Sequence, residues 1–215
     1  MEKIQYKEQS IENLYKIKGQ IGSGTFYKVF EAEEIQEPHR KVALRVLDLA
    51  VFFLSNQGQY FLTLLREIKT FELKHPNIVE NIDCFIDQNQ LVSVFELATY
   101  GLDKLIESYK QDGVYMTNVQ ICQIMIHILM GLEYTHSKGT IHRDISADNI
   151  LFCAEQGLYK LADFGVATFG TTVNYGGKHD YMAPEVKEQK HYNYKADIWS
   201  SSLSTNSFRS TQRDI

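Results

Sequence analysis

The sequence predicts an α+β fold of two lobes, in which a strand-rich half precedes a helix-rich half. From residue 15 to about residue 94, short runs typical of strands alternate with turns, and one helical stretch interrupts them. Beyond Gly101 the apolar residues recur at the spacing of a helix. No internal repeat or low-complexity linker separates the two halves. We therefore place the hinge between the lobes near residues 95–101.

The first lobe is expected to hold a small antiparallel sheet and one main helix. Its strand-like runs are bounded by turn signals and cover residues 15–22, 27–34, 41–47, 79–87 and 90–97. Between the third and fourth runs, residues 59–77 have helical spacing. The segment His75-Pro76-Asn77 should end this helix, because proline cannot continue helical hydrogen bonding.

The second lobe is expected to be mainly helical. Its clearest helix carries apolar residues at positions i, i+3, i+4, i+7, i+8 and i+11, namely Ile121, Ile124, Met125, Ile128, Leu129 and Leu132. This spacing predicts a helix with one buried face.

Composition limits the class of protein. With 215 residues, of which 44% are hydrophobic, the chain can bury a sizeable core. A net charge of -5 argues against nucleic-acid binding, which needs a basic surface. No apolar run is long enough to span a membrane, and the three cysteines lack the spacing of a disulfide framework or a zinc site. We expect a soluble, cytoplasmic protein with no nucleic-acid or membrane partner.

Seven short motifs follow one another in a fixed order. IHRDISADNI at 141–150 precedes LADFG at 161–165 and YMAPE at 181–185. The others are GSGTFYKV at 22–29, VALR at 42–45, REI at 66–68 and DIWS at 197–200. In order and spacing these motifs resemble those of the protein kinase family, and YMAPE is similar to the serine/threonine branch of that family.

The resemblance implies a protein kinase domain over residues 15–200, with a strand-rich lobe at 15–98 and an incomplete helical lobe at 99–200. After DIWS the family continues with an apolar central helix, whereas this chain continues with a serine- and threonine-rich segment at 201–215. Such residues compete for backbone hydrogen bonds and supply no apolar face. We therefore expect a C-terminally truncated catalytic domain, an aberrant polar tail, and a partner that covers the incomplete lobe.

The resemblance also implies a chemistry, the transfer of the γ-phosphoryl group of ATP to a protein substrate's hydroxyl. Such an enzyme must hold ATP, hold magnesium and aim the hydroxyl. Asp144 would accept the hydroxyl's proton, while Asn149 and Asp163 would supply oxygen ligands to Mg²⁺. His142 and Phe164 are expected to be packing residues. Asp197 is expected to hold the backbone of the catalytic loop.

The residues that the resemblance assigns to ATP are Gly22, Gly24, Val29, Ala43, Arg45, Glu67, Glu96, Ala98 and Leu151. The two glycines would let the backbone approach the phosphates without a Cβ in the way. Three apolar members, Val29, Ala43 and Leu151, would sandwich the adenine. The backbone of Glu96 and Ala98 would hydrogen-bond its edge.

Arg45 stands where the family has a lysine that bridges the ATP phosphates to Glu67. Arginine keeps the charge, but its planar fork is wider than an ammonium. By analogy with the loss of one preorganised donor, we expect turnover to fall by roughly 10² to 10³. Lys28 is not expected to compensate, because strand side chains alternate faces and its neighbour Val29 points into the site. Tyr27 adds bulk over the phosphates.

Two further departures fall at Ser146 and Lys178. The family usually has lysine at the first position and threonine at the second, and these two residues meet the catalytic aspartate. The sequence leaves two interpretations open. Either a hydroxyl and an ammonium have been exchanged between two loops, or both positions have drifted in a failing catalytic site.

Control by phosphorylation is also implied. Arg143 precedes the catalytic aspartate, and in the family such an arginine belongs to a basic pocket for a phosphorylated segment. Thr171, Thr172 and Tyr175 are the candidate sites, and solvated loop hydroxyls are the alternative.

The departures from the family leave a second function open. Instead of an active kinase, the chain is then a pseudokinase that binds nucleotide or protein without turnover, or an inactive truncated fragment.

Overall fold

The computed structural model describes residues 10–24, 27–37, 39–50, 71–173 and 176–209. The chain divides into two compact units, of which the first comprises residues 1–62 and 80–97 and the second comprises residues 63–79 and 98–215. A five-stranded antiparallel sheet forms the first unit, and the long helices lie in the second. The predicted two-lobe α+β fold is confirmed.

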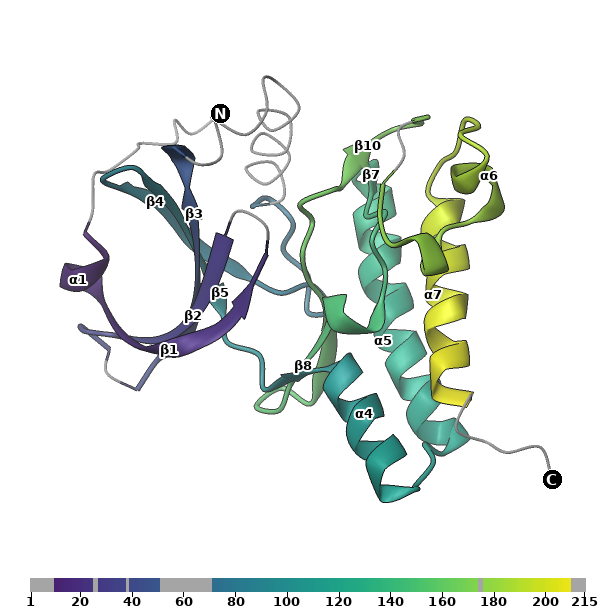
Figure 1. Cartoon of the computed structure of the whole chain (residues 1–215), viewed down its shortest axis with the longest axis horizontal. Coiled ribbons are helices and arrows are strands. Elements are labelled where there is room, and N and C mark those ends of the chain that lie inside the picture. Colours follow the sequence, from purple (N-terminus) through teal and green to yellow (C-terminus); the bar gives the residue numbers. More distant parts are fainter. Residues whose placement is uncertain (1–9, 25–26, 38, 51–70, 174–175, 210–215) are drawn as a thin grey trace. The chain divides into compact units, whose positions relative to one another are not determined.

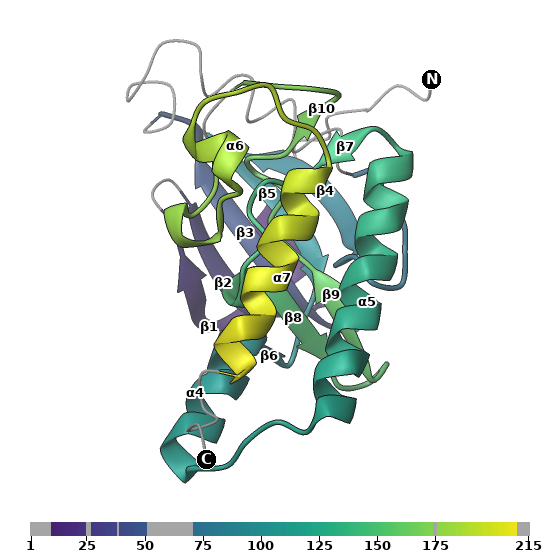
Figure 2. The same cartoon turned by 90° about the vertical axis from the view of Figure 1, so that its right-hand side faces the viewer.

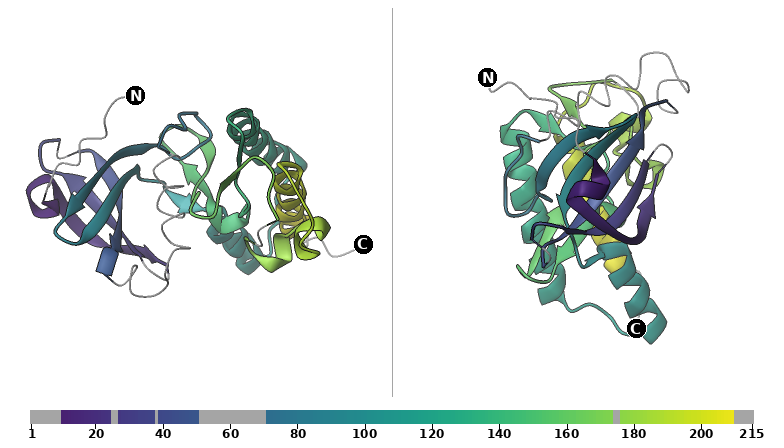
Figure 3. Two further views of the ribbon diagram at one scale, coloured as in Figure 1. Left: turned by 90° about the horizontal axis from the view of Figure 1, so that it is seen from above. Right: turned by 90° about the vertical axis from the view of Figure 1, so that its left-hand side faces the viewer.

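The described part of the first unit is built around one antiparallel sheet with the strand order β1-β2-β3-β5-β4. The short helix α1 (Ile11–Leu14) precedes the strands, which are β1 (Tyr15–Ser23), β2 (Tyr27–Glu34), β3 (Lys41–Asp48), β4 (Asn81–Asp87) and β5 (Gln90–Glu96). The sheet is curved (Figure 1, Figure 3). The five predicted strands are confirmed, with ends that differ by two residues at most.

Side chains of β3 alternate between the two faces of this sheet. Val42 and Leu44 are fully buried in the core of the first unit. The other buried members of that core are Ile11, Tyr15, Ala32, Phe85, Val92 and Val94. Ala43 and Arg45 point to the opposite face, because successive residues of a strand face opposite sides. The alternation of side chains along β3 thus places the residues that stabilise the sheet on one face and those predicted to bind nucleotide on the other.

The helix predicted over residues 59–77 falls largely outside the described residues. Its described end, residues 71–77, contains turns at 71–72 and 76–77 and no helix. Pro76 lies in this stretch, and proline both lacks the amide donor and restricts the residue before it. The prediction therefore extended the helix too far toward the proline.

The second unit contains four described helices, α4 (Leu102–Asp112), α5 (Asn118–Ser137), α6 (Pro184–Lys187) and α7 (Lys195–Arg209). Short strands form two small sheets, one of β6 (Tyr100–Gly101), β8 (Ile150–Cys153) and β9 (Leu158–Leu161), the other of β7 (Thr140–Ile141) and β10 (Thr168–Phe169). None of the described helices is both long enough and apolar enough to cross a membrane.

Helix α5 begins at a capping box and supplies one wall of the second unit's core. The Thr117 hydroxyl accepts from the Gln120 amide at 3.3 Å, and the Gln120 side chain accepts from the Thr117 amide at 2.9 Å. The predicted buried face is confirmed for Ile124, Ile128 and Leu132, which pack in the core, while Ile121 and Met125 pack at its margin.

Leu129 is a correction to that face, because its side chain is 41% exposed. Each residue turns a helix by about 100°, so Leu129 lies a full step round from the buried Ile128. The remaining buried members of the core are Leu73, Ile78, Leu102, Ile106, Met116, Ile145, Ala147, Ile150, Leu161, Phe164 and Ala167.

Helix α7 continues beyond residue 200, where the sequence predicted a polar tail. It lies beside α5 (Figure 2). The hydroxyl of Ser200 donates to the carbonyl of Ala196 at 3.0 Å, and that of Ser204 donates to the carbonyl of Ser200 at 3.0 Å. Both serines are buried, and so is Ser201. Bonding back to the preceding turn satisfies these hydroxyls within the helix, so that small polar side chains can line a buried face.

Candidate active site

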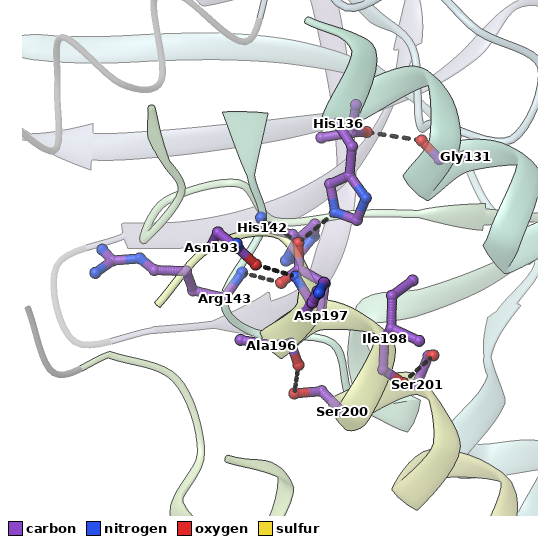
Figure 4. Close-up of polar contacts among 12 residues, drawn as sticks. Gly131, His136, His142, Arg143, Asn193, Ala196, Asp197, Ile198, Ser200 and Ser201 are labelled. Atoms are coloured by element: carbon purple, nitrogen blue, oxygen red, sulfur yellow. Dashed lines mark hydrogen bonds and ion pairs between the residues drawn. The ribbon is translucent and has the colours of Figure 1, made fainter. Parts of the chain in front are cut away.

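Asp197, in the first turn of α7, holds the backbone of the HRD segment (residues 142–144). Its Oδ2 accepts the amide of His142 and its Oδ1 accepts the amide of Arg143, each at 2.8 Å. The Nε2 atom of His136, on α5, lies 2.8 Å from Oδ2 (Figure 4). Asp197 is fully buried, and a buried carboxylate is tolerated where donors surround it. Its predicted structural role is confirmed.

His142 connects the HRD segment to the DFG segment (residues 163–165). Its ring lies 4.4 Å from the ring of Phe164 between centroids, and its Nε2 atom lies 3.0 Å from the carbonyl oxygen of Ala162. Both rings are buried. The prediction that these two residues serve packing is confirmed, and their contact places Asp163 next to an anchored residue.

Asp144 and Asn149 are brought together by the short 3₁₀ turn η1 (Ala147–Asn149). The Nδ2 atom of Asn149 donates to the backbone carbonyl of Asp144 and to its carboxylate Oδ2, both at 2.8 Å. Because the amide nitrogen is turned toward Asp144, the amide oxygen of Asn149 points elsewhere. The Asn149 carbonyl accepts the amide of Ala162 at 2.9 Å, which ties this turn to the strand end before Asp163.

Asp163 adopts a left-handed backbone with φ of 56°. Such a conformation costs a non-glycine residue on the order of 1 to 3 kcal/mol and concentrates at functional sites. Its Oδ1 accepts the amide of Gly165 at 3.2 Å. Within the described ranges no cluster of three or more His, Cys, Asp or Glu side chains offers a metal cage. The oxygens of Asn149 and Asp163 instead fit Mg²⁺, which binds few protein ligands and keeps waters and phosphates.

Arg143 also has a positive φ, of 70°, and its side chain points away from Asp197 (Figure 4). Its Nε donates to the carbonyl of Val166 at 2.5 Å and its Nη1 donates to the hydroxyl of Tyr192 at 3.3 Å. Thr172 pairs with Tyr192 through two backbone hydrogen bonds of 3.1 and 3.0 Å. Two of the predicted regulatory residues, Arg143 and Thr172, therefore meet at one tyrosine that sequence reasoning missed.

The remaining candidate phosphorylation sites differ in accessibility. Thr171 is exposed and Thr172 is half-buried. Tyr175 lies outside the described residues. Its neighbour Gly176 lies against the guanidinium of Arg143, since a Cβ at residue 176 would come 3.1 Å from Nη1.

Lys178 reaches the catalytic loop with both its backbone and its side chain. Its amide donates to Asp144 Oδ1 at 3.1 Å, and its ammonium donates to the hydroxyl of Ser146 at 2.9 Å and pairs with Asp148. Burial alone raises the pKa of the Asp148 carboxyl, but hydrogen bonds from Lys178 and Ser146 and the lysine's charge outweigh it and hold that pKa below its usual value. The sequence had pointed to Ser146 and Lys178, whereas no sequence signal marked Asp148.

Three residues of the first unit that are predicted to bind nucleotide, Val29, Ala43 and Arg45, share one face of the sheet. Val29 stands opposite Arg45, and Ala43 stands opposite Phe95. The guanidinium carbon of Arg45 lies 5.3 Å from the ring centre of Tyr27 and 5.2 Å from that of Phe95. These distances are in the range of cation–π contacts. Arg45 is therefore oriented by an aromatic ring on each of the two neighbouring strands.

The two predicted phosphate-loop glycines differ in their surroundings. A Cβ at Gly22 would meet Val29 at an ordinary 3.6 Å, whereas a Cβ at Gly24 would come 2.5 Å from the ring of Tyr27. A side chain at residue 24 would therefore require the Tyr27 ring to move. Lys28 is exposed on β2, and the alternation of the strand turns it away from the face that carries Val29.

The other predicted ATP residues are distributed over both units. The Glu96 amide donates to the Glu80 carbonyl at 3.1 Å, and the Glu96 carboxylate accepts the Glu80 amide at 2.6 Å. Ala98 and Leu151 belong to the second unit, where both are half-buried. Glu67 lies outside the described residues, so its predicted pairing with Arg45 stays a prediction.

Comparison with known protein families finds a match to the protein kinase domain over residues 15–208. The chain belongs to the protein kinase family. The match includes the strands of the first unit and nearly all of α7, and it spans the HRD and DFG segments whose geometry is given above.

Protein kinases of several organisms are similar to this kinase domain. Serine/threonine-protein kinase ppk11 of Schizosaccharomyces pombe is 36% identical over 208 residues, which cover 93% of this chain and 60% of that protein. Germinal center kinase 3 of Caenorhabditis elegans is 37% identical over 210 residues, which cover 86% of this chain and 34% of that protein. Calcium/calmodulin-dependent protein kinase type 1 of Macrobrachium nipponense is 29% identical, and the match covers 93% of this chain and 57% of that protein. The chain therefore spans 60% or less of each of these relatives.

Proposed function

We propose that this kinase domain transfers the γ-phosphoryl group of ATP to serine or threonine hydroxyls of a protein substrate. The observation that carries the proposal is the pairing of the Asp144 carboxylate with the Asn149 amide. This contact brings the proposed proton acceptor, Asp144, next to Asn149, whose amide oxygen suits Mg²⁺. Both residues lie within one turn of the chain.

Asp144 acts as the proton acceptor. Its two carboxylate oxygens each accept one hydrogen bond, Oδ1 from the Lys178 amide and Oδ2 from Asn149. These bonds orient the carboxylate, and each oxygen keeps a lone pair for the substrate. In the transfer, the substrate oxygen bonds to the γ-phosphorus as the bond from that phosphorus to the bridging oxygen of ADP breaks. The hydroxyl proton passes to Asp144.

Asn149 and Asp163 would hold Mg²⁺, which neutralises phosphate charge when it is bound. The residues of the first unit serve the rest of the nucleotide. Val29 and Ala43 offer an apolar surface to adenine, and Arg45 offers a guanidinium to the phosphates. We also assign Gly22, Gly24, Glu96, Ala98 and Leu151 to nucleotide binding.

The substitution Asp144→Asn tests the proposal. We expect kcat for transfer of label from γ-labelled ATP to a serine/threonine peptide library to fall by about 10² to 10⁴, the usual contribution of a general base. Nucleotide affinity should stay unchanged. The control Asp112→Asn alters an exposed carboxylate at the end of α4 and should leave kcat unchanged. Equal rates for both variants would exclude Asp144 as the base.

A pseudokinase is the second candidate, and the contacts of Arg45 favour it. A guanidinium held by Tyr27 and Phe95 supports nucleotide binding, but its breadth crowds the transferred phosphate. Tight binding of Mg-ATP without phosphate transfer by the wild-type chain would favour this candidate over the enzyme.

We also propose a cytoplasmic location and a protein partner on the second unit. Cys84, Cys122 and Cys153 are free thiols, which suits a reducing compartment. Val119, Ile126 and Met130 on α5 are exposed apolar side chains, and their spacing i, i+7, i+11 places them on one face of the helix. Surfaces of this kind mark protein contacts.

A further inference from the structure

Lys178 is anchored at the catalytic loop by its backbone before its side chain makes any contact. The preceding residue, Gly177, has φ of 92°, and a Cβ there would come 2.0 Å from the carbonyl oxygen of Arg143. Only glycine permits this approach. The Lys178 amide then donates to Asp144 Oδ1 at 3.1 Å. The position of Lys178 beside the proton acceptor is therefore set by close-packed backbone.

The side chain of Lys178 returns to the same loop. Its ammonium donates to Ser146 at 2.9 Å and pairs with Asp148. Ser146 is fully buried, so its hydroxyl is a fixed acceptor. The lysine side chain is 42% exposed. In the described part of the chain the Lys178 ammonium has two partners, Ser146 and Asp148. An ammonium has three N–H donors. One N–H of a positioned cation is thus left for a ligand.

Phosphoryl transfer needs such a donor. Negative charge is spread over the oxygens of the transferred group, and the protein contributes by positioning and by electrostatic stabilisation. A cation fixed before the reaction stabilises that charge without reorganising. Ser146 lies two residues after Asp144 in the chain, and Lys178 bonds to both. A phosphoryl group that reaches Asp144 would therefore come within the range of the Lys178 ammonium.

We propose that Lys178 is a catalytic residue whose ammonium contacts the transferred phosphoryl group, and that Ser146 positions this ammonium. The proposal rests on the proposed function. It places the cation on the segment that leads from the candidate phosphorylation sites to η2 (His179–Tyr181), so that the shape of this segment decides whether the cation is in place.

Because Lys178 and Ser146 touch, exchanging them tests the proposal. We expect Lys178→Ser to lower kcat for peptide phosphorylation by about 10² to 10³, the usual effect of removing one preorganised donor. Ser146→Lys alone places two ammonium groups in contact and should also lower kcat. The double variant Ser146→Lys with Lys178→Ser restores one ammonium and one hydroxyl. It should recover at least tenfold over Lys178→Ser, a coupling that independent sites do not show.

Further measurements separate catalysis from structure. Nucleotide affinity and the melting temperature should change little in Lys178→Gln, which keeps the length of the side chain, while kcat falls. Lys187→Ser, an exposed lysine on α6, is the matched control and should be unaffected.

Three outcomes test the two proposals. A folded Lys178→Gln variant with wild-type kcat, or no recovery in the double variant, would overturn the role of Lys178 and leave the proposed function intact. Absence of any transfer by the wild-type chain would overturn both.

Discussion

At Arg45, side-chain shape has as much effect as charge. The guanidinium lies 5.3 Å from the ring centre of Tyr27 and 5.2 Å from that of Phe95, and two such contacts can contribute about 0.5 to 1 kcal/mol each. An ammonium at the same position is more compact and leaves more room for phosphate. The two rings therefore hold the guanidinium of the residue that departs from the family, and we propose that this arrangement suits nucleotide binding better than phosphoryl transfer.

We predict that Arg45→Lys raises the rate of phosphate transfer at least tenfold, about 1.4 kcal/mol of activation free energy, because an ammonium reaches the phosphates without crowding them. Initial rates with γ-labelled ATP measure this change. Arg40→Lys is the matched control, since Arg40 precedes the same strand and pairs with Glu34 at 3.5 Å near the surface, and its rate should not change. An equal or lower rate for Arg45→Lys would contradict the prediction.

The described part of the segment from β10 to η2 is connected to the HRD segment. Thr172 bonds to Tyr192 through its backbone, Tyr192 accepts from Arg143, and Arg143 precedes Asp144. Further along the segment, Lys178 donates to Asp144 itself. A charge added to this segment would thus act on the contacts of Arg143 and of Asp144, the residue that we propose as the proton acceptor.

We predict that phosphorylation of Thr171, Thr172 or Tyr175 raises activity, because a phosphate pairs strongly with guanidinium. Mass spectrometry of protein from its native cells, separated into active and inactive fractions, should find the modification enriched in the active fraction. Alanine at the modified residue should lower activity. Ser108→Ala, at an exposed serine on α4, should not. A segment that is unmodified in the active fraction would refute this form of control.

At the scale of the whole molecule, the described helices α5 and α7 leave several large apolar side chains exposed to solvent. The described long helices expose large apolar side chains, namely Val119, Ile126, Leu129 and Met130 on α5 and Ile198 and Trp199 on α7. Burying one such side chain is worth about 1.5 to 3 kcal/mol. Leaving several in water gives up a large share of a typical stability of about 5 to 15 kcal/mol.

We predict that the 215-residue chain expressed alone binds apolar dyes and melts below about 60 °C. The double variant Ile126→Lys with Met130→Lys should reduce dye binding and change the free energy of unfolding by no more than about 0.5 kcal/mol per site. The buried control on the same helix, Ile128→Ala, should cost about 2 to 5 kcal/mol. A monomer that melts cooperatively above that temperature without binding dye would show that this surface is no liability.

Local patterns predicted much of the fold. The five strands were recovered from alternation and turn residues, because the period of a strand is written into consecutive positions. The buried face of α5 followed from its spacing, except at Leu129, one residue step from the core. The pairing of Asp144 with Asn149 was also accessible, since both belong to one short motif and a single turn brings them together.

What the sequence determined by itself is therefore the family, the strands and the residues of each motif, because these depend on neighbours along the chain. The tertiary structure decided three further points. It extended α7 through serines that bond to the preceding turn, placed Arg45 by the rings of Tyr27 and Phe95, and brought Lys178 onto Ser146. Each depends on atoms that meet only after folding, and no periodicity records which distant hydroxyl, ring or carboxylate a side chain will meet.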